Sequence, residues 1–198
     1  MLKRALDLVT ALLGLVLLSP VMLVIAAAVR LDSPGPAFFR QQRVARGGRI
    51  FEILKFRSMR DLPAGSGKLI TVEHDSRITM VGAFLRRTKL DELPQLINVL
   101  KGDMSLVGPR PEVSKYVDLY PAEIRALVLS VRPGITDEAS IEFRNESALL
   151  ASAVDPESCY ITEILPRKLE IYARYAQKHT LLGDLRILAR TLLAVVRH

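Results

Sequence analysis

The longest apolar run in the sequence begins at Leu8 and ends at Val29, and no residue within it carries a formal charge. As a straight helix this run would be about 33 Å long, enough for a bilayer hydrocarbon core of about 30 Å. A helix that is apolar on every side could also lie inside a protein core, but a chain of 198 residues can hardly surround it. We therefore expect a membrane-embedded helix within residues 1–32 and a separate domain over residues 33–198.

Ser19 and Pro20 lie near the middle of this run and predict a kink, because proline removes one backbone hydrogen bond and clashes with the preceding turn. A cleavable signal peptide is disfavoured, since the run is long for a signal core and Pro20 interrupts it. Basic residues flank both ends, and they are Lys3, Arg4, Arg30, Arg40, Arg43, Arg46 and Arg49. Because basic flanks tend to stay in the cytoplasm, both ends are expected on that side, as in a re-entrant helix that dips into one leaflet.

Two strand-like runs follow at residues 37–44 and 50–59, and the segment Arg46-Gly47-Gly48-Arg49 between them suits a tight β-hairpin turn. The second run carries Lys55 and Arg57 among apolar residues. These two cations would either meet lipid headgroups or face a phosphorylated ligand, and the sequence leaves both interpretations open.

Helical periodicity dominates the rest of the chain. Predicted helices cover residues 78–87, a segment from Leu90 or Asp91 to Leu100, and residues 113–120, 121–130, 161–177 and 181–196, with a loop at residues 62–68. Thr88 is expected to cap the segment that begins near Asp91, and Gly102 to end it. The last helix is amphipathic with a basic flank, so it either packs on the core or lies at the membrane interface. The expected fold class is α/β, mostly α.

The overall composition narrows the choice of partners. The chain has a net charge of +7 and an isoelectric point near 9.8, which favours an anionic membrane surface, nucleic acid or phosphorylated substrates. Nucleic acid is disfavoured, because only 6% of the residues are aromatic and no base-stacking or groove-reading motif occurs. Cys159 is the single cysteine, which excludes disulfides within the chain, and His74, His179 and His198 lack metal-ligand spacing.

Asp91 and Glu92 are adjacent acids at the start of a predicted helix, shortly after the basic pair Arg86-Arg87. The helix dipole and these cations favour ionised carboxylates. An ionised aspartate can attack phosphorus, and a neighbouring carboxylate can hold Mg²⁺ together with substrate phosphates. Such acids are also common helix caps, so a membrane-anchored scaffold without catalytic activity stays an alternative.

Arg110 lies between Pro109 and Pro111 in the segment Gly108–Pro111. The two prolines fix the backbone, which lowers the entropic cost of presenting a guanidinium as a bidentate phosphate donor. The alternative is a rigid loop that merely exposes an arginine. Asp103, a third acid nearby, is interpreted as a turn residue after the helix rather than as a catalytic group.

Several motifs occur together in this order: Lys3-Arg4-x-x-Asp7, Ser19-Pro20, Lys55-Phe56-Arg57-Ser58-Met59, Leu90-Asp91-Glu92-Leu93-Pro94-Gln95-Leu96, Asn98-Val99-Leu100-Lys101-Gly102-Asp103-Met104-Ser105 and Gly108-Pro109-Arg110-Pro111. Together they resemble the bacterial sugar transferases, the monotopic polyprenyl-phosphate phosphoglycosyl transferases. The resemblance extends from Lys3 to Thr136. It implies an enzyme of the bacterial inner (cytoplasmic) membrane whose catalytic domain faces the cytoplasm.

The resemblance also implies a reaction, the first membrane step of bacterial glycoconjugate or polysaccharide biosynthesis. A phosphosugar would move from a UDP-sugar to a polyprenyl phosphate such as undecaprenyl phosphate, with release of UMP and with Mg²⁺ as cofactor. Asp91 would form a covalent phosphosugar intermediate, while Glu92 would assist it and help to hold the metal.

Residues outside the acid pair also match functional positions of this family. Arg86, Arg110 and Pro111 match positions at the nucleotide diphosphate, and either Lys55 or Arg57 would join them. Ser19-Pro20 matches the kink of the family's re-entrant membrane helix.

The sequence departs from the family after Thr136, where many relatives continue Gly-Trp-Ala-Gln and this chain has Asp137-Glu138-Ala139-Ser140. This stretch is expected to border the sugar pocket, so the departure leaves the identity of the sugar open. The prenyl chain length, the glycan pathway and the oligomeric state, a homo-oligomer included, are likewise open.

Overall fold

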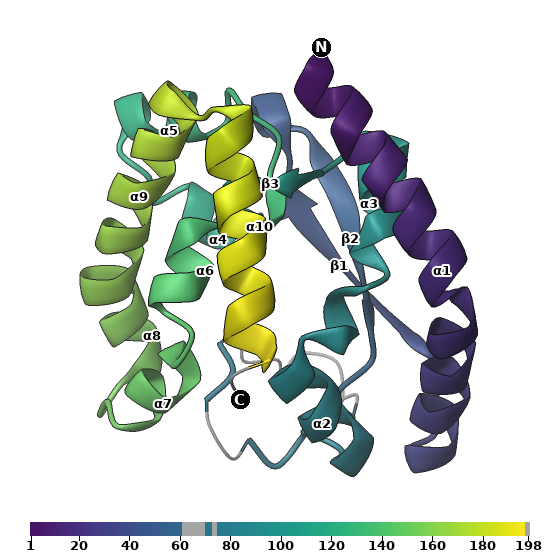
Figure 1. Cartoon of the computed structure of the whole chain (residues 1–198). Helices are drawn as coiled ribbons and strands as arrows, with labels where there is room; N and C mark the ends of the chain where they lie inside the picture. The colour runs from purple at the N-terminus through teal and green to yellow at the C-terminus, as the bar shows by residue number, and fades with distance from the viewer. Residues whose placement is uncertain (61–69, 73–74, 197–198) are drawn as a thin grey trace.

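The structure, a computed structural model, describes residues 1–60, 70–72 and 75–196 and is mostly helical with two small sheets (Figure 1). This confirms the mostly α character expected from the sequence. The loop predicted at residues 62–68 and the side chains of His74 and His198 lie outside the described residues.

The N-terminal helix α1 (Leu2–Asp32) runs without interruption through Pro20 and lies along the body of the protein with one face. Asp7, Ala11, Ile25 and Val29 are buried on that face, whereas large apolar side chains on the other faces are exposed. Only 11% of its most apolar stretch is buried, so α1 is not a core helix. Among the described residues it is the one helix long and apolar enough to cross a membrane, judged by length and composition alone.

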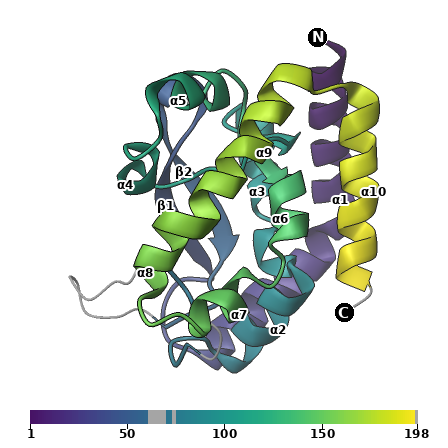
Figure 2. The ribbon, with the colours of Figure 1, turned by 90° about the vertical axis from the view of Figure 1, so that its left-hand side faces the viewer.

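Both ends of α1 contact the same body. Near the N-terminus, Arg4 donates hydrogen bonds to the carbonyls of Val99 and Met104. Near the C-terminus, Ile25 and Val29 belong to a buried apolar cluster with residues of the body. In Figures 1 and 2 the ribbon of α1 changes direction part-way along its length. The dip into one leaflet and the boundary after residue 32 stay predictions.

The predicted hairpin is confirmed by strands β1 (Phe38–Val44) and β2 (Ile50–Phe56), which pair antiparallel with Phe38 opposite Phe56 and Val44 opposite Ile50. The turn between them is a short 3₁₀ segment, η1 (Arg46–Gly48). Gly47 has a φ of 71° and Gly48 a φ of 80°, which explains the double glycine because other residues rarely adopt such angles.

The free edge of β2 is joined to a helix by one side chain. Asn98 of α3 (Gln95–Lys101) accepts a hydrogen bond from Leu54 N at 3.0 Å and donates one to Glu52 O at 2.7 Å. These bonds satisfy edge groups of β2 that would otherwise lack a strand partner. They also fix the strand that carries Lys55 against the helix that follows the acid pair.

The helix after the acids begins later than the sequence predicted. α2 (Met80–Thr88) is followed by the 3₁₀ turn η2 (Leu90–Glu92), and α3 starts at Gln95. The prediction that Thr88 caps this segment was wrong, because its hydroxyl donates to carbonyls inside α2. Lys89 instead reverses the chain in the left-handed region, with a φ of 58°. The expected end at Gly102 is confirmed by its φ of 90°.

A second, parallel sheet pairs β3 (Ser105–Val107) with β4 (Gly134–Thr136). Gly108 and Gly134 are in backbone contact, and a Cβ on either would collide with main-chain atoms of the other segment. This close approach places the Arg110 loop beside the start of the segment that departs from the family pattern.

The C-terminal half is mainly helical (Figure 2). They are α4 (Ser114–Val117), α5 (Ala122–Val128), α6 (Glu138–Glu142), α7 (Glu146–Ala151), α8 (Pro156–Cys159), the π-helical turn η3 (Tyr160–Ile164), α9 (Leu165–Lys178) and α10 (Leu181–Val196). The four helices predicted in this half are present, although the first two are shorter than expected. Asp137 caps α6 by accepting the N–H of Ser140 at 2.8 Å.

Candidate active site

A cavity of about 940 Å³ lies between the β1–β2 hairpin, the end of α2 and the C-terminal helices. The predicted site residues that line it are Lys55, Arg57, Arg86, Asp91, Glu92 and Arg110, so the structure brings these six together. The cavity is large enough for a ligand of the size of a nucleotide sugar.

Glu92 is the centre of the polar wall of this cavity. Its Oε1 accepts hydrogen bonds from Lys55 Nζ and from Arg110 Nη2, each at 2.7 Å. The side chain is buried, and burial alone would raise its pKa. The charges of Arg110 and Lys55 outweigh burial and hold the pKa of Glu92 well below its usual range. Glu92 is therefore ionised at neutral pH and fixes the two cations in place.

The cations respond to this arrangement in opposite directions. The carboxylate of Glu92 holds the pKa of Arg110 well above its usual range, despite burial. Burial lowers the pKa of Lys55, and Glu92 only partly offsets it. Lys55 is thus the cation whose charge depends most on its neighbours.

Asp91 differs from Glu92 although the two residues are adjacent. Its side chain is buried, with 6% exposure, and its Oδ1 has no hydrogen-bond partner among the described residues. Burial raises the pKa of Asp91, the charge of Lys55 opposes this, and Glu92 adds to the rise. Buried carboxylate oxygens in folded proteins almost always have a partner. Asp91 lines the cavity, so the unmet hydrogen-bonding capacity of this buried oxygen makes Asp91 a candidate functional residue.

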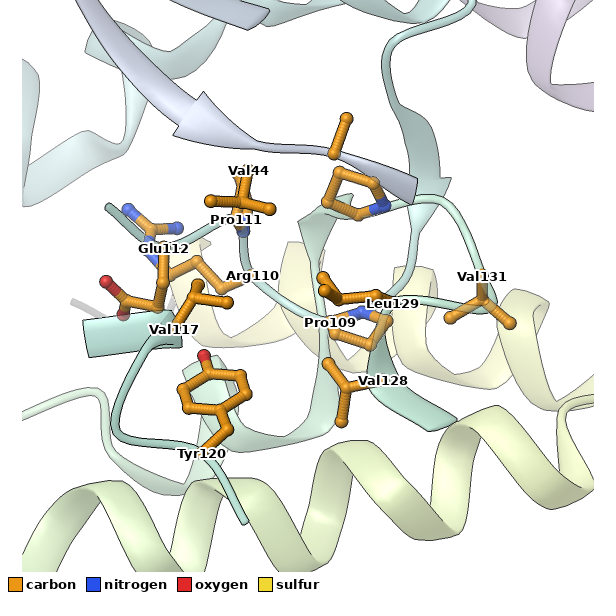
Figure 3. A pocket seen from close by; sticks show the side chains of 12 residues that line it. Val44, Pro109, Arg110, Pro111, Glu112, Val117, Tyr120, Val128, Leu129 and Val131 are labelled. Atoms are coloured by element: carbon orange, nitrogen blue, oxygen red, sulfur yellow. The ribbon is translucent and has the colours of Figure 1, made fainter. Parts of the chain in front are cut away.

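Arg110 is held by the rigidity of its loop. Pro109, Pro111, Val44 and Tyr120 line a small apolar pocket of about 20 Å³ behind the loop (Figure 3). This space holds no more than a water molecule, so it is a packing gap and not a ligand site. Pro111 lines this gap and not the large cavity, and its carbonyl accepts a hydrogen bond from Arg43.

The two cations that the sequence left as alternatives, Lys55 and Arg57, both line the cavity but have different hydrogen-bond partners. The guanidinium of Arg57 donates to the carbonyls of Val29, Ser33 and Pro34, where α1 ends. Arg57 thereby joins the end of α1 to the hairpin, while Lys55 donates a hydrogen bond to Glu92. Arg86, at the end of α2, lines the cavity, and its Nη1 lies 3.8 Å from the sulfur of Met59.

One further group in the cavity was not recognised from the sequence. Glu112 accepts a hydrogen bond from Tyr160 OH at 2.6 Å and pairs with Arg43 Nη1 at 3.4 Å. All three residues line the cavity. The position of Glu112 directly after the Pro-Arg-Pro turn was the available signal, but Tyr160 and Arg43 come from distant segments that no local pattern connects to it.

No group of three or more His, Cys, Asp or Glu side chains that could hold a metal ion occurs among the residues that the structure describes. Asp91 and Glu92 form a pair of carboxylates only. Mg²⁺ commonly takes one or two carboxylates and completes its coordination with water and substrate phosphates. The pair, with one unpaired oxygen on Asp91, fits an ion that arrives with a phosphorylated substrate.

Comparison with known proteins extends these observations. A family model described as bacterial sugar transferase matches residues 1–198. The chain belongs to the bacterial sugar transferase family. The resemblance seen in the motifs is thereby confirmed.

Several sugar-phosphate transferases are similar to this chain over much of its length. The UDP-glucose:undecaprenyl-phosphate glucose-1-phosphate transferase of Escherichia coli (strain K12) is 41% identical over 196 residues, which are 96% of this chain and 39% of that protein. The protein of the same name from Caulobacter vibrioides is 40% identical over 192 residues, 96% of this chain and 67% of that protein.

A third relative in the family carries a different sugar in its name. The UDP-N-acetylgalactosamine-undecaprenyl-phosphate N-acetylgalactosaminephosphotransferase of Aeromonas hydrophila is 45% identical over 141 residues, 70% of this chain and 33% of that protein. The chain thus spans about a third to two fifths of the length of two of these relatives. Family membership therefore leaves the sugar undetermined.

Proposed function

We propose that this protein transfers a sugar 1-phosphate from a UDP-sugar to a polyprenyl phosphate at a membrane. The observation that carries the proposal is the buried Asp91 carboxylate, with an unpaired oxygen, at the wall of a cavity that also contains Glu92, Lys55 and Arg110. The names of the relatives support the choice of donor and acceptor.

The reaction would proceed in two displacements. In the first, a carboxylate oxygen of Asp91 attacks the β-phosphorus of the UDP-sugar, and the bond to the bridging oxygen breaks. UMP leaves with that oxygen and its electron pair, so the sugar phosphate is joined to Asp91 as an acyl phosphate. In the second, a phosphate oxygen of the polyprenyl phosphate attacks the same phosphorus. The bond to Asp91 breaks, the carboxylate is restored, and polyprenyl diphosphate sugar is released.

The residues around Asp91 would stabilise the charge that develops on the phosphates. Arg110 and Lys55 are already held at Glu92, so their reorganisation during the reaction would be small. Arg86 lines the same cavity and would contact the diphosphate from the α2 side. Glu92 acts here as a positioning residue, since it holds both cations, and we assign the open choice of substrate cation to Lys55 rather than Arg57.

Asp91 and Glu92 would hold Mg²⁺ when the substrate binds. The ion would supply charge neutralisation for the diphosphate. The two side chains are the proposed Mg²⁺ site, and the unpaired oxygen of Asp91 supports this proposal.

The membrane placement belongs to the same proposal. The exposed apolar faces of α1 would lie in lipid, and the body that contacts both of its ends would lie on the cytoplasmic side of a bacterial inner membrane. If α1 crossed the bilayer, its two ends would lie on opposite sides of the membrane. Both ends contact the same body, so this favours a re-entrant α1 with its bend near Ser19-Pro20.

The proposal is tested by incubating the purified protein with Mg²⁺, polyprenyl phosphate and each of several UDP-sugars, and by measuring UMP. At least one donor should give UMP together with a lipid-linked sugar. Asp103→Asn is the matched control, because Asp103 is a nearby acid that pairs with Arg49 outside the cavity, and it should retain transfer. Absence of UMP with every donor would favour the non-catalytic scaffold.

A further inference from the structure

One wall of the cavity is apolar, in contrast to the charged wall that carries Asp91 and Glu92. Ile135 of β4, Ile141 of α6, and Leu192 and Ala194 of α10 all line it. The proposed reaction needs a place for two chemically different acceptor parts, an anionic phosphate and a long isoprenoid chain. The charged wall suits the anionic phosphate, and the apolar wall suits the isoprenoid chain.

Helix α10 connects this wall to the exposed surface. Asp184 and Ile187 are buried on one face of α10, whereas Leu182, Leu185 and Leu192 are exposed on another. The exposed leucines recur at helical spacing and form a stripe along the helix that ends at the cavity. Leu192 is 67% exposed and lines the cavity at the same time, so it belongs to both surfaces.

The position of α10 is fixed from both ends. Near its start, Asp184 accepts hydrogen bonds from Lys3 of α1 at 2.7 Å and from Tyr175 at 2.8 Å. Near its end, the hydroxyls of Thr191 and Thr136 form a hydrogen bond of 2.7 Å. Figure 2 shows α10 and α1 on the same side of the molecule. The leucine stripe therefore borders the side where the proposed membrane helix lies.

We infer that the isoprenoid chain of the lipid acceptor enters along the leucine stripe of α10 and passes between Leu192, Ala194 and Ile141, with its phosphate at the acid pair. This inference rests on the proposed function. The nucleotide part of the donor carries charge and many hydrogen-bonding groups, which an apolar wall would leave unpaired. A prenyl chain has neither, and its free end must remain in lipid, which the continuous stripe allows.

Adjacent leucines on α10 supply a matched pair of variants. Leu192 and Leu193 are both exposed, at 67% and 55%, but only Leu192 lines the cavity. Leu192→Ala and Leu193→Ala remove the same group, so any general contribution of α10 to membrane affinity should change by similar amounts in the two variants. If Leu192 also contacts the acceptor, Leu192→Ala should weaken acceptor binding beyond this shared effect.

The experiment separates the two half-reactions. Exchange of labelled UMP into the UDP-sugar, measured without acceptor, reports the first displacement, and transfer to undecaprenyl phosphate in detergent micelles reports both. Leu192→Ala should raise the KM for undecaprenyl phosphate about tenfold and leave the exchange rate unchanged. Leu193→Ala should change neither by more than about twofold. Ala194→Phe, which narrows the same passage, should reduce transfer while exchange continues.

Other outcomes overturn the inference. Equal effects of Leu192→Ala and Leu193→Ala on acceptor KM would mean that α10 serves only as a general membrane contact. Loss of exchange in Leu192→Ala or Ala194→Phe would assign this wall to the UDP-sugar instead. If the unaltered protein shows neither exchange nor transfer with any donor, the proposed function fails and the inference fails with it.

Discussion

Two buried clusters of charged side chains have similar composition but different internal pairing. The cluster at the proposed active site, or catalytic cluster, contains Asp91, Glu92, Lys55 and Arg110. The anchor cluster lies beneath the start of α1 and contains Lys3, Asp7, Asp184, Ser105 and Tyr175. In the anchor cluster both acids are fully paired: Asp7 accepts from Ser105 Oγ and Leu106 N, and Asp184 accepts from Lys3 and Tyr175. In the catalytic cluster one oxygen of Asp91 has no partner among the described residues.

This difference separates a structural use of buried charge from a functional one. A buried acid with all its hydrogen bonds formed holds segments together, and its loss leaves their donors unpaired. A buried acid without a partner costs folding free energy and is retained where it contacts a ligand. We therefore expect changes in the anchor cluster to reduce stability and changes at Asp91 to reduce activity.

The largest effect is expected for Asp91→Asn. The amide is a poor nucleophile, so transfer and UMP exchange should fall by about four orders of magnitude or more. Its stability should be unchanged or higher at neutral pH, because the folded state disfavours the ionised form of Asp91, whose pKa burial raises. Turnover assays and urea unfolding of the same preparations measure both. A variant that keeps its turnover would remove Asp91 from the mechanism.

Glu92→Gln should reduce both stability and activity. It leaves Lys55 and Arg110 with no carboxylate between them, so we expect a loss of about 3 kcal/mol in the free energy of unfolding. The rate of transfer should fall about a hundredfold as the cations lose their fixed positions. The stabilisation by Glu92 is present above about pH 4.5 and is lost as pH falls, since its folded pKa lies below the unfolded value.

The control for this change is Glu138→Gln. Glu138 pairs with Arg190 at the surface, where both side chains are about half exposed. Exposed pairs contribute little to stability, so urea unfolding should be nearly unchanged. Comparable losses in the two variants would mean that burial of the catalytic cluster carries no energetic weight.

Asp7→Ala should show the opposite pattern to Asp91→Asn. The change leaves the N–H of Leu106 and the hydroxyl of Ser105 buried without their acceptor, which should cost about 2 kcal/mol of stability. Transfer per folded molecule should remain within about twofold of the unaltered protein. Asp7→Asn, which keeps one acceptor oxygen, should recover part of the stability. A specific loss of activity at full stability would contradict the assignment of Asp7 to a structural role.

The smallest expected effect is a shift in pH dependence. Asp91 must be ionised to attack, and its raised pKa places the acidic fall in exchange rate above the usual aspartate range. Lys55 lowers the pKa of Asp91, so Lys55→Met should move this fall to higher pH as well as reduce the rate. Rates of UMP exchange measured across the acidic range test this. A shift of the acidic fall to lower pH in Lys55→Met would contradict the conclusion that Lys55 lowers the pKa of Asp91.

Local patterns predicted the elements that depend on short stretches of sequence. The apolar run of α1, the double glycine of the hairpin, Gly102 and the rigid loop at Arg110 each carry their signal within a few residues. The acid pair could be named for the same reason. The role proposed for it depends on the motifs taken together.

Long-range pairing accounts for what the sequence did not predict. The parallel contact of β3 with β4 depends on Gly108 and Gly134, which are far apart in the chain. Asn98 takes the place of a strand at the edge of β2, a role that no helical periodicity indicates. The sequence left Lys55 and Arg57 as alternative substrate contacts, and no local pattern indicated that the Arg57 guanidinium binds carbonyls at the end of α1. In each case the partner is set by tertiary packing.

The central claim is that Asp91 becomes covalently bound to the phosphosugar. The most direct measurement uses a UDP-sugar with a radiolabelled β-phosphorus, mixed with the protein and Mg²⁺ without acceptor and quenched in denaturant. We predict label on the denatured protein that hydroxylamine releases, as expected of an acyl phosphate, and that polyprenyl phosphate removes before the quench. Asp91→Asn should carry no label. Transfer by the unaltered protein without any labelled intermediate, or equal labelling of Asp91→Asn, would contradict the account.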